Sequence, residues 1–543
     1  MLRKIRISLS VLSILAVTLL FLDFTGTVHA YLGWMAKIQF LPALLALNAG
    51  VIAALVILTL IFGRVYCSVI CPLGILQDGI AWLGRRGKKN RLKYGWSPEK
   101  KWLRYTMLGV MAVAIIAGIG SLVALLAPYS AYGRIVQSLF APVYGWGNNA
   151  LAYLAERKES YAFYRTDVWL KGLSTLIVAA VTLILLAILA WRNGRTYCNT
   201  ICPVGTVLSF FSRFAMFRPV IDKEKCKNCK LCEHRCKAAC INIDGHKIDY
   251  SRCVDCFDCI DNCKFGALKY RFAWGEKIPE QVRNDAQGVR NDAQGVRNDA
   301  QGVRNDAPDA GAESKGTDAG RRAFLVGTAL AVGSVALKAQ KDKADGAMAV
   351  ISDQDDDLEE KKVDGGLAPI KEKKRPARKT PLVPPGAGSL KNFSRHCTAC
   401  QLCVSVCPSG VLRPSTGLLT LMQPESSYER GYCRPECTKC SEVCPSGAIR
   451  KITREEKTAI QIGRAVWVKE NCLAARGRRC DNCAQHCPAG AIQMIEMDLD
   501  GRTRKVPLVN ENKCIGCGAC ENLCPARPYS GIYVEGYTIH NDI

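Results

Sequence analysis

Twenty-four of the 29 cysteines in this chain fall into six short runs of four, with a spacing typical of ligands for iron-sulfur clusters. Two runs have the pattern Cys-x2-Cys-x2-Cys-x3-Cys-Pro: Cys397, Cys400, Cys403 and Cys407, and Cys514, Cys517, Cys520 and Cys524. Two variants lie between them: Cys433, Cys437, Cys440 and Cys444, and Cys472, Cys480, Cys483 and Cys487. Two earlier runs end in Cys-Lys: Cys226, Cys229, Cys232 and Cys236, and Cys253, Cys256, Cys259 and Cys263. We therefore expect six [4Fe-4S] clusters.

The runs are expected to work in pairs. In the bacterial ferredoxin run, three thiolates bind one cluster and the fourth binds a second cluster. We expect the two outer C-terminal runs to exchange their last cysteines, Cys407 and Cys524. The two inner runs would then exchange Cys444 and Cys487.

The two earlier runs contain a spare cysteine. We expect Cys236 to complete the second cluster of this pair and Cys263 to complete the first. Cys240 lies four residues after Cys236. It could replace Cys236 as the fourth ligand, and is otherwise a buried thiol.

Zinc and disulfides are the alternatives for so many cysteines. Zinc sites pair two Cys-x2-Cys halves across a spacer, whereas each group here is one compact run. Cysteines three residues apart on a tight loop are poor disulfide partners, and all six runs would need the same coincidence. The spacing therefore favours iron-sulfur clusters.

Four apolar stretches in the N-terminal part are each about long enough to cross a bilayer: Ile7 to Leu22, Ile38 to Phe62, Trp102 to Ala127 and Leu173 to Trp191. The formal net charge is +25, and many basic residues precede the first stretch or follow the second and fourth. The positive-inside rule then places both ends of a four-span bundle in the cytoplasm. No nucleic-acid motif accompanies the positive charge. A cleaved signal peptide over residues 1–30 is the alternative for the first stretch, and we prefer an anchor.

Four further cysteines belong to a repeat, Gly-Arg-x-Tyr-Cys-x3-Cys-Pro-x-Gly, which begins at Gly63 and again at Gly194. Each copy follows the second span of a helix pair, so the pattern predicts a duplicated two-helix unit. Cysteines four residues apart on a helix face the same way, and the two copies could converge on one site. That site would be an additional metal or redox centre at the membrane face: Cys67, Cys71, Cys198 and Cys202. The alternative is a pair of structural turns with reduced thiols.

The sequence between the two groups of runs predicts an export signal. Residues 284–304 are three identical copies of Asn-Asp-Ala-Gln-Gly-Val-Arg, which indicates a disordered linker. Arg321 and Arg322 then precede a weakly apolar stretch, as in a Tat signal, here inside the chain. A domain that folds around its clusters in the cytosol must cross the membrane folded, which the Tat route permits. The alternative is an unused relic of a once-separate signal.

The absence of several cofactor motifs restricts which molecules could donate electrons to this chain. The chain has no Cys-x2-Cys-His for c-type haem, only His29 lies near a span, and no Gly-x-Gly-x2-Gly fingerprint indicates a nucleotide or flavin. We therefore expect exchange with a lipid-soluble carrier or another protein, with quinol as the natural donor. The aromatic residues between Pro128 and Leu170 predict an interfacial belt, and a quinone pocket could use a few of them.

The first half of the chain resembles the NapH and MauN type of membrane subunit, the quinol dehydrogenase that serves periplasmic nitrate reductase. The resemblance rests on the cysteine repeat, the four spans and the following two-cluster ferredoxin, and covers residues 1 to about 272. From about residue 320 the chain resembles the partner of that subunit, the NapG and MauM type of four-cluster ferredoxin. The resemblance implies two partner subunits fused in one chain. Cys-Lys in place of Cys-Pro in the earlier runs, and Cys240, depart from the pattern.

Together these patterns predict a membrane α-helical bundle carrying α+β ferredoxin-like domains. The expected segments are a four-span domain (1–215), a two-cluster ferredoxin (216–272), a linker (273–320), a Tat-like signal or fifth span (321–340), a tether (341–389) and a four-cluster ferredoxin (390–543). We expect a bacterial inner-membrane protein with its first ferredoxin in the cytoplasm and its C-terminal one exported. Its partners would be the quinone pool and an oxidoreductase or cytochrome.

Two other functions compete with this one. The same cysteine repeat with two clusters resembles membrane proteins that assist cytochrome oxidase assembly, in which electrons would reduce a metal or a cysteine. Four extra clusters argue against such a maturation factor, because it needs few electron transfers. A redox sensor like the nitrous oxide reductase accessory protein would carry a flavin-bearing outer domain, which the sequence does not contain.

Overall fold

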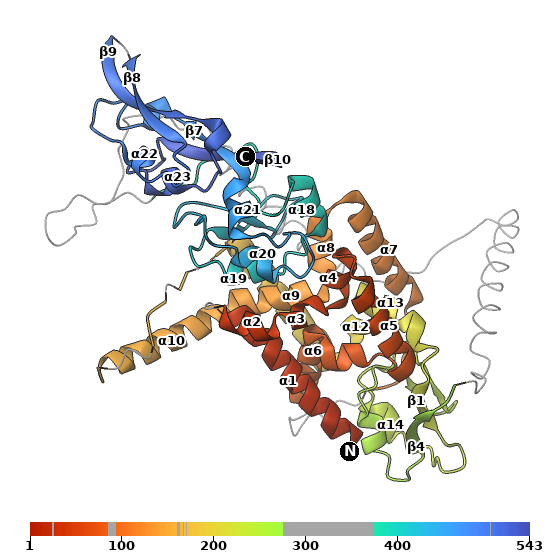
Figure 1. Ribbon diagram of the computed structural model, residues 1–543. Coiled ribbons are helices and arrows are strands. Elements are labelled where there is room, and N and C mark those ends of the chain that lie inside the picture. Colours follow the sequence, from red (N-terminus) through yellow and green to blue (C-terminus); the bar gives the residue numbers. More distant parts are fainter. Residues whose placement is uncertain are drawn as a thin grey trace, which may run out of the picture.

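The computed structural model describes residues 1–23, 26–84, 94–159, 163–166, 168–169, 171–274, 373–499 and 501–543. A helical domain lies in the middle, with a small α+β domain at one end and a larger one at the other (Figure 1). Nearly all of the predicted linker (273–320), the Tat-like stretch (321–340) and most of the tether (341–389) lie outside the described residues.

Two of the four predicted spans are single long helices, α1 (Leu2–Leu22) and α11 (Leu173–Asn193). In the described part of the chain, only these two are long and apolar enough to cross a membrane. Both helices expose large apolar side chains to the surroundings, Leu12 and Leu15 on α1 and Ile184 on α11 among them. Such a surface is expected where helices face lipid.

The other two predicted spans are broken. The second divides into α4 (Phe40–Leu45) and α5 (Ala49–Phe62), since Leu47 has a φ of 53° and the Asn48 side chain caps α5. The third divides into α7 (Lys101–Ala117) and α8 (Gly120–Leu126) at Gly118, whose φ is 74°. Hydropathy could not detect these breaks, because the residues at them are themselves mostly apolar or small.

Shorter helices complete the helical domain: α2 (Thr27–Leu32), α3 (Trp34–Lys37), α6 (Pro72–Gly84), α9 (Pro128–Ile135), α10 (Ala141–Glu156), α12 (Thr196–Thr200), α13 (Pro203–Ser212) and the π-helical turns η1 (Tyr66–Ile70) and η2 (Val136–Phe140). Helices α6 and α13 each begin with the proline of the cysteine repeat. Proline suits the first turn of a helix because its missing N–H would have no intrahelical partner there. In each copy of the repeat, the second cysteine of the pair therefore lies directly before a helix.

The first ferredoxin domain is a small α+β unit. Strand β1 (Phe217–Ile221) pairs antiparallel with β4 (Leu268–Phe272), and β2 (Ile241–Asn242) pairs with β3 (Lys247–Ile248). Its helices are single turns, α14 (Leu231–Arg235) and α15 (Asp258–Asp261). Cysteines make up much of its buried core, so the domain has little other apolar material to hold it together.

The C-terminal domain contains three two-stranded antiparallel sheets. They are β7 (Ile460–Trp467) with β10 (Ile532–Asp542), β8 (Ile492–Leu499) with β9 (Arg502–Val509), and β5 (Leu412–Pro414) with β6 (Pro424–Ser426). Its short helices are α18 (Leu390–His396), α19 (Leu402–Ser405), α20 (Lys439–Val443), α21 (Arg454–Ala459), α22 (Asn482–Gln485) and α23 (Ala519–Leu523), with 3-10 turns η3 (Lys469–Asn471) and η4 (Glu511–Lys513).

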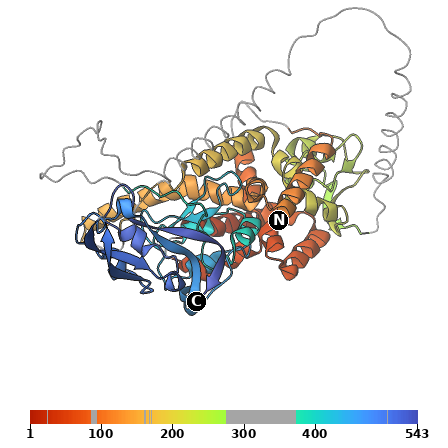
Figure 2. The same cartoon turned by 90° about the horizontal axis from the view of Figure 1, so that it is seen from above.

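The two ferredoxin domains lie at opposite ends of α1 (Figure 1), and on opposite sides of the molecule when it is seen from above (Figure 2). At its start, Arg3 binds Asp258 and Asp261 of the first ferredoxin domain, each at 2.8 Å. At its other end, Phe21 packs in one buried core with Cys400 and Cys403 of the C-terminal domain. A helix of this length, 21 residues, spans about 30 Å, which is the thickness of the apolar part of a bilayer.

Candidate iron-sulfur sites

The C-terminal domain gathers its cysteines into four sets. Three sets each line one small cavity: Cys407, Cys433, Cys437 and Cys440; Cys472, Cys480, Cys483 and Cys524; and Cys487, Cys514, Cys517 and Cys520. In the fourth set, burial raises the pKa of three neighbouring thiols, Cys397, Cys400 and Cys403, and Cys444 is near enough to raise the pKa of each of them further. Every set thus contains three cysteines of one run and the last cysteine of another, as expected for paired clusters.

The pairing predicted from the sequence is wrong. Neighbouring runs exchange their last cysteines, so that Cys444 lies with the first run, Cys407 with the second, Cys524 with the third and Cys487 with the fourth. The reason is that the helices of neighbouring runs pack together, α19 on α20 and α22 on α23. The similar spacing of the outer runs carries no information about these contacts.

A cavity in the first ferredoxin domain is lined by Cys236, Cys253, Cys256 and Cys259 together with Cys240. This arrangement agrees with the expected transfer of Cys236 to the second run. The Sγ atoms of Cys236 and Cys240 are 3.5 Å apart, so Cys240 lies beside the predicted ligand. Ligation by the first run, Cys226, Cys229 and Cys232 with Cys263, stays a prediction.

The two copies of the cysteine repeat bring their four thiols together in the helical domain. Cys67, Cys71, Cys198 and Cys202 are all buried. Burial, and then the nearness of Cys198 and Cys67, raises the pKa of Cys71 to about 12. Burial likewise raises the pKa of Cys202, with Cys198 and Cys71 as the nearest charged neighbours. Such a group is unfavourable as free thiolates, and a bound cation would remove both the protons and the repulsion.

Two buried arginines hold the repeat copies together in a reciprocal way. Arg64 of the first copy donates to the backbone oxygen of Cys198 at 3.2 Å, and Arg195 of the second copy donates to that of Cys67 at 2.7 Å. Gly74 and Gly205 make room for these contacts, because a Cβ on either would lie within 2.4 Å of the same two carbonyl oxygens. The glycines and arginines of the repeat therefore have a structural role.

A buried carboxylate connects this thiol group to the first ferredoxin domain. Asp78 on α6 accepts from Arg195 at 2.9 and 2.7 Å and from Arg6 at 2.7 Å, and Lys237 Nζ lies 3.6 Å away. Lys237 also binds Asp258 at 3.0 Å. The sequence did not predict this contact, because Asp78, Arg6 and Lys237 come from distant segments and Asp78 belongs to no motif.

Helix α9 lies between the thiol group and the C-terminal domain. The Arg134 side chain is 1% exposed and donates from Nη1 to the Ala124 oxygen at 2.8 Å. Burial lowers the pKa of Arg134 to about 10. Tyr197 of the second repeat and Cys400 are near enough to act to raise it. Arg134 is therefore close to both the second cysteine repeat and the first C-terminal run.

No three His, Cys, Asp or Glu side chains of the described residues are gathered tightly enough to bind a single metal ion. Many of the thiols instead line small cavities. A [4Fe-4S] cluster takes one thiolate on each of four iron atoms, so its ligands are spread more widely than those of one ion. The described thiol sets therefore fit clusters better than single ions.

Comparison with protein families supports iron-sulfur binding in both halves of the chain. A model described as a 4Fe-4S binding domain matches residues 44–91 and 173–221, which contain the two cysteine repeats. Two models described as 4Fe-4S dicluster domains match residues 396–449 and 476–527. Each dicluster match contains cysteines of two neighbouring runs, in agreement with the pairing in the structure.

Several curated proteins are similar to part of the chain. An uncharacterized protein of Methanocaldococcus jannaschii is 28% identical over 40% of this chain and 67% of its own length. The ferredoxin-type protein NapH of Escherichia coli K12 is 28% identical over 43% of this chain and 70% of its own. The methylamine utilization ferredoxin-type protein MauN of Paracoccus denitrificans is 27% identical over 37% of this chain and 57% of its own. No solved structure matches the chain.

These matches support a NapH/MauN-like polyferredoxin that works in iron-sulfur electron transport. Each of the three alignments covers less than half of the chain. Fusion to a NapG/MauM-type partner stays a prediction.

Proposed function

We propose that this iron-sulfur electron-transport protein is a membrane-bound quinol dehydrogenase that passes electrons through six [4Fe-4S] clusters to a partner oxidoreductase or cytochrome. The C-terminal domain would be a NapG/MauM-type ferredoxin fused to its usual membrane subunit. The observation that carries the proposal is the distribution of thiol sets, which occupy both ends of the helical domain and its middle.

The chain supplies buried cations beside the thiols as well as the thiols themselves. Burial raises the pKa of Cys433, Cys256 and Cys198, and a buried cation partly offsets this rise in each case: Lys457, Lys237 and Arg195, respectively. Clusters bound at such thiols would accept electrons one at a time, and the two electrons of a quinol would be taken singly. The role of the buried cations is to offset negative charge where water is excluded.

The exposed apolar surfaces of α1 and α11 support membrane placement. We infer that the broken pairs α4–α5 and α7–α8 complete a four-span arrangement in the bacterial inner membrane. Because Arg3 and the first ferredoxin domain lie at the same end of α1, that end would face the cytoplasm, and the C-terminal domain would face the other side.

Protease treatment tests this topology. When protease is added to intact spheroplasts, the domain of residues 373–543 is expected to be cut while the domain of residues 216–272 is protected. Antibodies to tags at residue 274 and at the C-terminus would follow the two domains. Protection of both domains until lysis would refute export.

The thiol group of the helical domain is proposed to hold a further iron centre. Replacing Cys67, Cys71, Cys198 and Cys202 together by serine is expected to lower the iron content by about four atoms per chain if the centre is a cubane. Iron is measured per polypeptide in purified protein, with Ser68→Ala, a buried neighbour of Cys67, as control. Unchanged iron in the quadruple variant would contradict an iron centre there.

Quinol oxidation is tested by adding a menaquinol analogue to anaerobic membranes and recording low-temperature EPR spectra. Cluster reduction that a quinone-site inhibitor blocks is the expected result. Clusters that respond to dithionite but never to quinol would overturn the proposal. A maturation factor that reduces a metal or a cysteine for a respiratory oxidase would then be the better account.

A further inference from the structure

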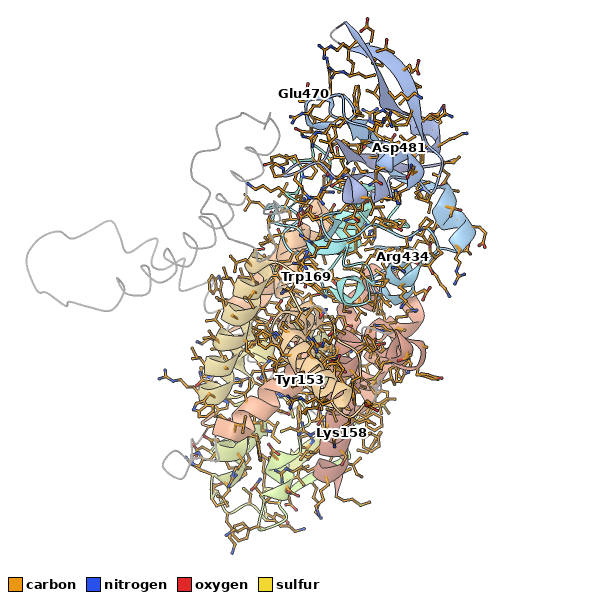
Figure 3. The ribbon with its side chains drawn as sticks, turned by 90° about the vertical axis from the view of Figure 1, so that its left-hand side faces the viewer. Tyr153, Lys158, Trp169, Arg434, Glu470 and Asp481 are labelled. Atoms are coloured by element: carbon orange, nitrogen blue, oxygen red, sulfur yellow. The ribbon has the colours of Figure 1, made fainter. Side chains whose placement is uncertain are left out.

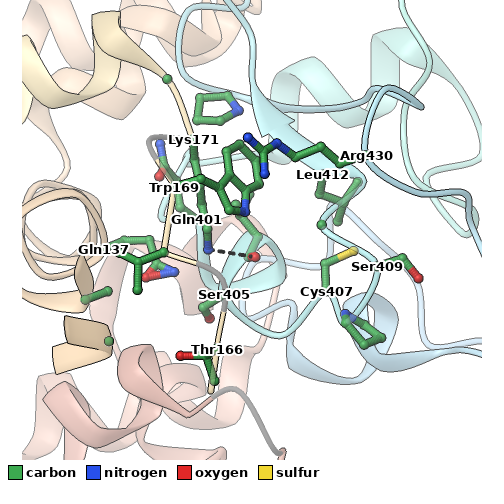
Figure 4. A pocket seen from close by; sticks show the side chains of 18 of the residues that line it. Gln137, Thr166, Trp169, Lys171, Gln401, Ser405, Cys407, Ser409, Leu412 and Arg430 are labelled. Carbon is green, nitrogen blue, oxygen red and sulfur yellow. Dashed lines mark hydrogen bonds between the residues drawn. The ribbon is translucent and has the colours of Figure 1, made fainter. Parts of the chain in front are cut away.

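A cavity of about 790 Å³ lies where the helical domain meets the C-terminal domain. Its walls come from the end of α1, from η2 and α10, from the segment before α11, and from the loop that follows α19 (Figure 4). In the side view, Trp169 is at this junction, on the side of the molecule where Arg434 also lies (Figure 3). The volume is in the range usual for pockets that bind small molecules.

Three buried polar groups in the wall have no hydrogen-bond partner within the described part of the chain. They are Gln137 Oε1, Thr175 Oγ1 and Gln401 Nε2. The residues are 6%, 1% and 2% exposed, respectively. Buried polar groups nearly always have a partner, and an unsatisfied one is costly. Three in the wall of one cavity therefore indicate a ligand that both accepts and donates hydrogen bonds.

The cavity also adjoins a predicted cluster ligand. Cys407 lies in its wall, beside the set that contains Cys433 and Cys440. Lys171 Nζ donates to the Val404 oxygen at 3.3 Å, the contact drawn as a dashed line in Figure 4. A molecule in the cavity would thus be next to the second C-terminal thiol set.

The rest of the wall combines aromatic and apolar side chains with basic and polar ones. The Trp169 ring packs against the guanidinium groups of Arg413 and Arg430, at 4.8 and 4.6 Å from the ring centroid. Helix α10 contributes Tyr144 to the wall and exposes Val143 and Trp146 to the surroundings. A helix that lines the cavity and also exposes apolar side chains suits a ligand that arrives from the lipid.

We propose that this cavity binds the head group of a quinol, with Gln401 donating to one ring oxygen and Gln137 accepting from a ring hydroxyl. This inference rests on the proposed quinol dehydrogenase function and assigns it a site. A quinol hydroxyl both donates and accepts hydrogen bonds. It can therefore pair with the unpartnered acceptor of Gln137 and with the unpartnered donor of Gln401. Oxidation to the quinone releases two electrons, which the neighbouring iron-sulfur clusters accept, and two protons, which leave to water.

The test uses the full chain in detergent with a fluorescent hydroxyquinoline N-oxide as a quinone analogue, whose quenching reports binding without any turnover. The double variant Gln137→Leu/Gln401→Leu is expected to bind the analogue roughly tenfold more weakly or worse, since about two hydrogen bonds are lost. Gln493→Leu, at an exposed position on β8, is the matched control and is expected to bind normally.

Dithionite reduction separates this inference from the proposed function and from misfolding. Dithionite should give the same EPR spectrum in the double variant and the parent, which shows that the thiol sets are intact. If the parent binds the analogue and quinol reduces it, but the double variant is unaffected, the cavity is not the quinol site and the function stands. If the parent neither binds the analogue nor responds to quinol, both proposals fail.

Discussion

Replacing the last cysteine of the second C-terminal run, Cys444→Ala, is expected to damage the cluster of the first run and to leave that of the second run intact. In the structure Cys444 faces Cys397, Cys400 and Cys403, whereas Cys433, Cys437 and Cys440 share their cavity with Cys407. A cluster that loses one of four thiolates becomes labile. The electron path through the junction with the helical domain would then be interrupted.

Iron analysis of combined variants checks this pairing. Replacing Cys397, Cys400 and Cys403 together by alanine should remove about four iron atoms per chain. Adding Cys444→Ala should then cause no further loss, because two changes in one site are not additive. Adding Cys524→Ala instead should remove a second cluster. A further loss of iron with Cys444→Ala and none with Cys524→Ala would contradict the pairing; Ser446→Ala controls for the shared loop.

The largest loss of stability is expected for Asp78→Ala. This carboxylate is the common partner of Arg195 and Arg6 and lies near Lys237, and all four side chains are buried. Removing it leaves buried cations without their counter-ion, which typically costs 3–5 kcal/mol for a single broken pair. Thermal unfolding in detergent, followed by circular dichroism, should show a markedly lower transition temperature.

The pH dependence of this contribution follows from the same charges. Burial acts to raise the pKa of Asp78, but Arg195 and Lys237 hold it well below its usual range. Because the folded pKa lies below the unfolded one, the contribution is present above the unfolded value and is lost only as pH falls toward the depressed one. The difference between variant and parent should therefore be constant from about pH 6 to 8. Asp244→Ala, which breaks an exposed pair with Lys230, should leave the transition unchanged.

The sequence was most informative where the determinant is local. Runs of cysteines place their thiols on one loop whatever surrounds them, and the family matches agree with iron-sulfur binding at the repeats and C-terminal runs. Exchange of the last cysteines depends on which helices pack together, so spacing alone could not identify the partner of Cys444. The helix breaks at Leu47 and Gly118 could not be predicted from the sequence either, because hydropathy measures composition and not backbone conformation.

The candidate quinol cavity shows a second reason why the sequence alone could not predict the site. Gln137, Thr175 and Gln401 have no motif and no unusual spacing, and Gln401 even stands within a cysteine run. Their significance comes only from being buried around one cavity without hydrogen-bond partners among the described residues. The aromatic loop did point to this region, since Trp169 and Tyr144 line the cavity.

The reciprocal contacts of Arg64 and Arg195 have the pattern of an isologous dimer interface, in which each subunit makes the same contact with the other. Here the two subunits are successive parts of one polypeptide. A symmetric homodimer would have to carry the same residue at both corresponding positions, whereas covalent linkage lets them differ. The chain uses that freedom: Asp78 follows the first copy at the position where Ser209 follows the second, so only the first is acidic there and meets Lys237.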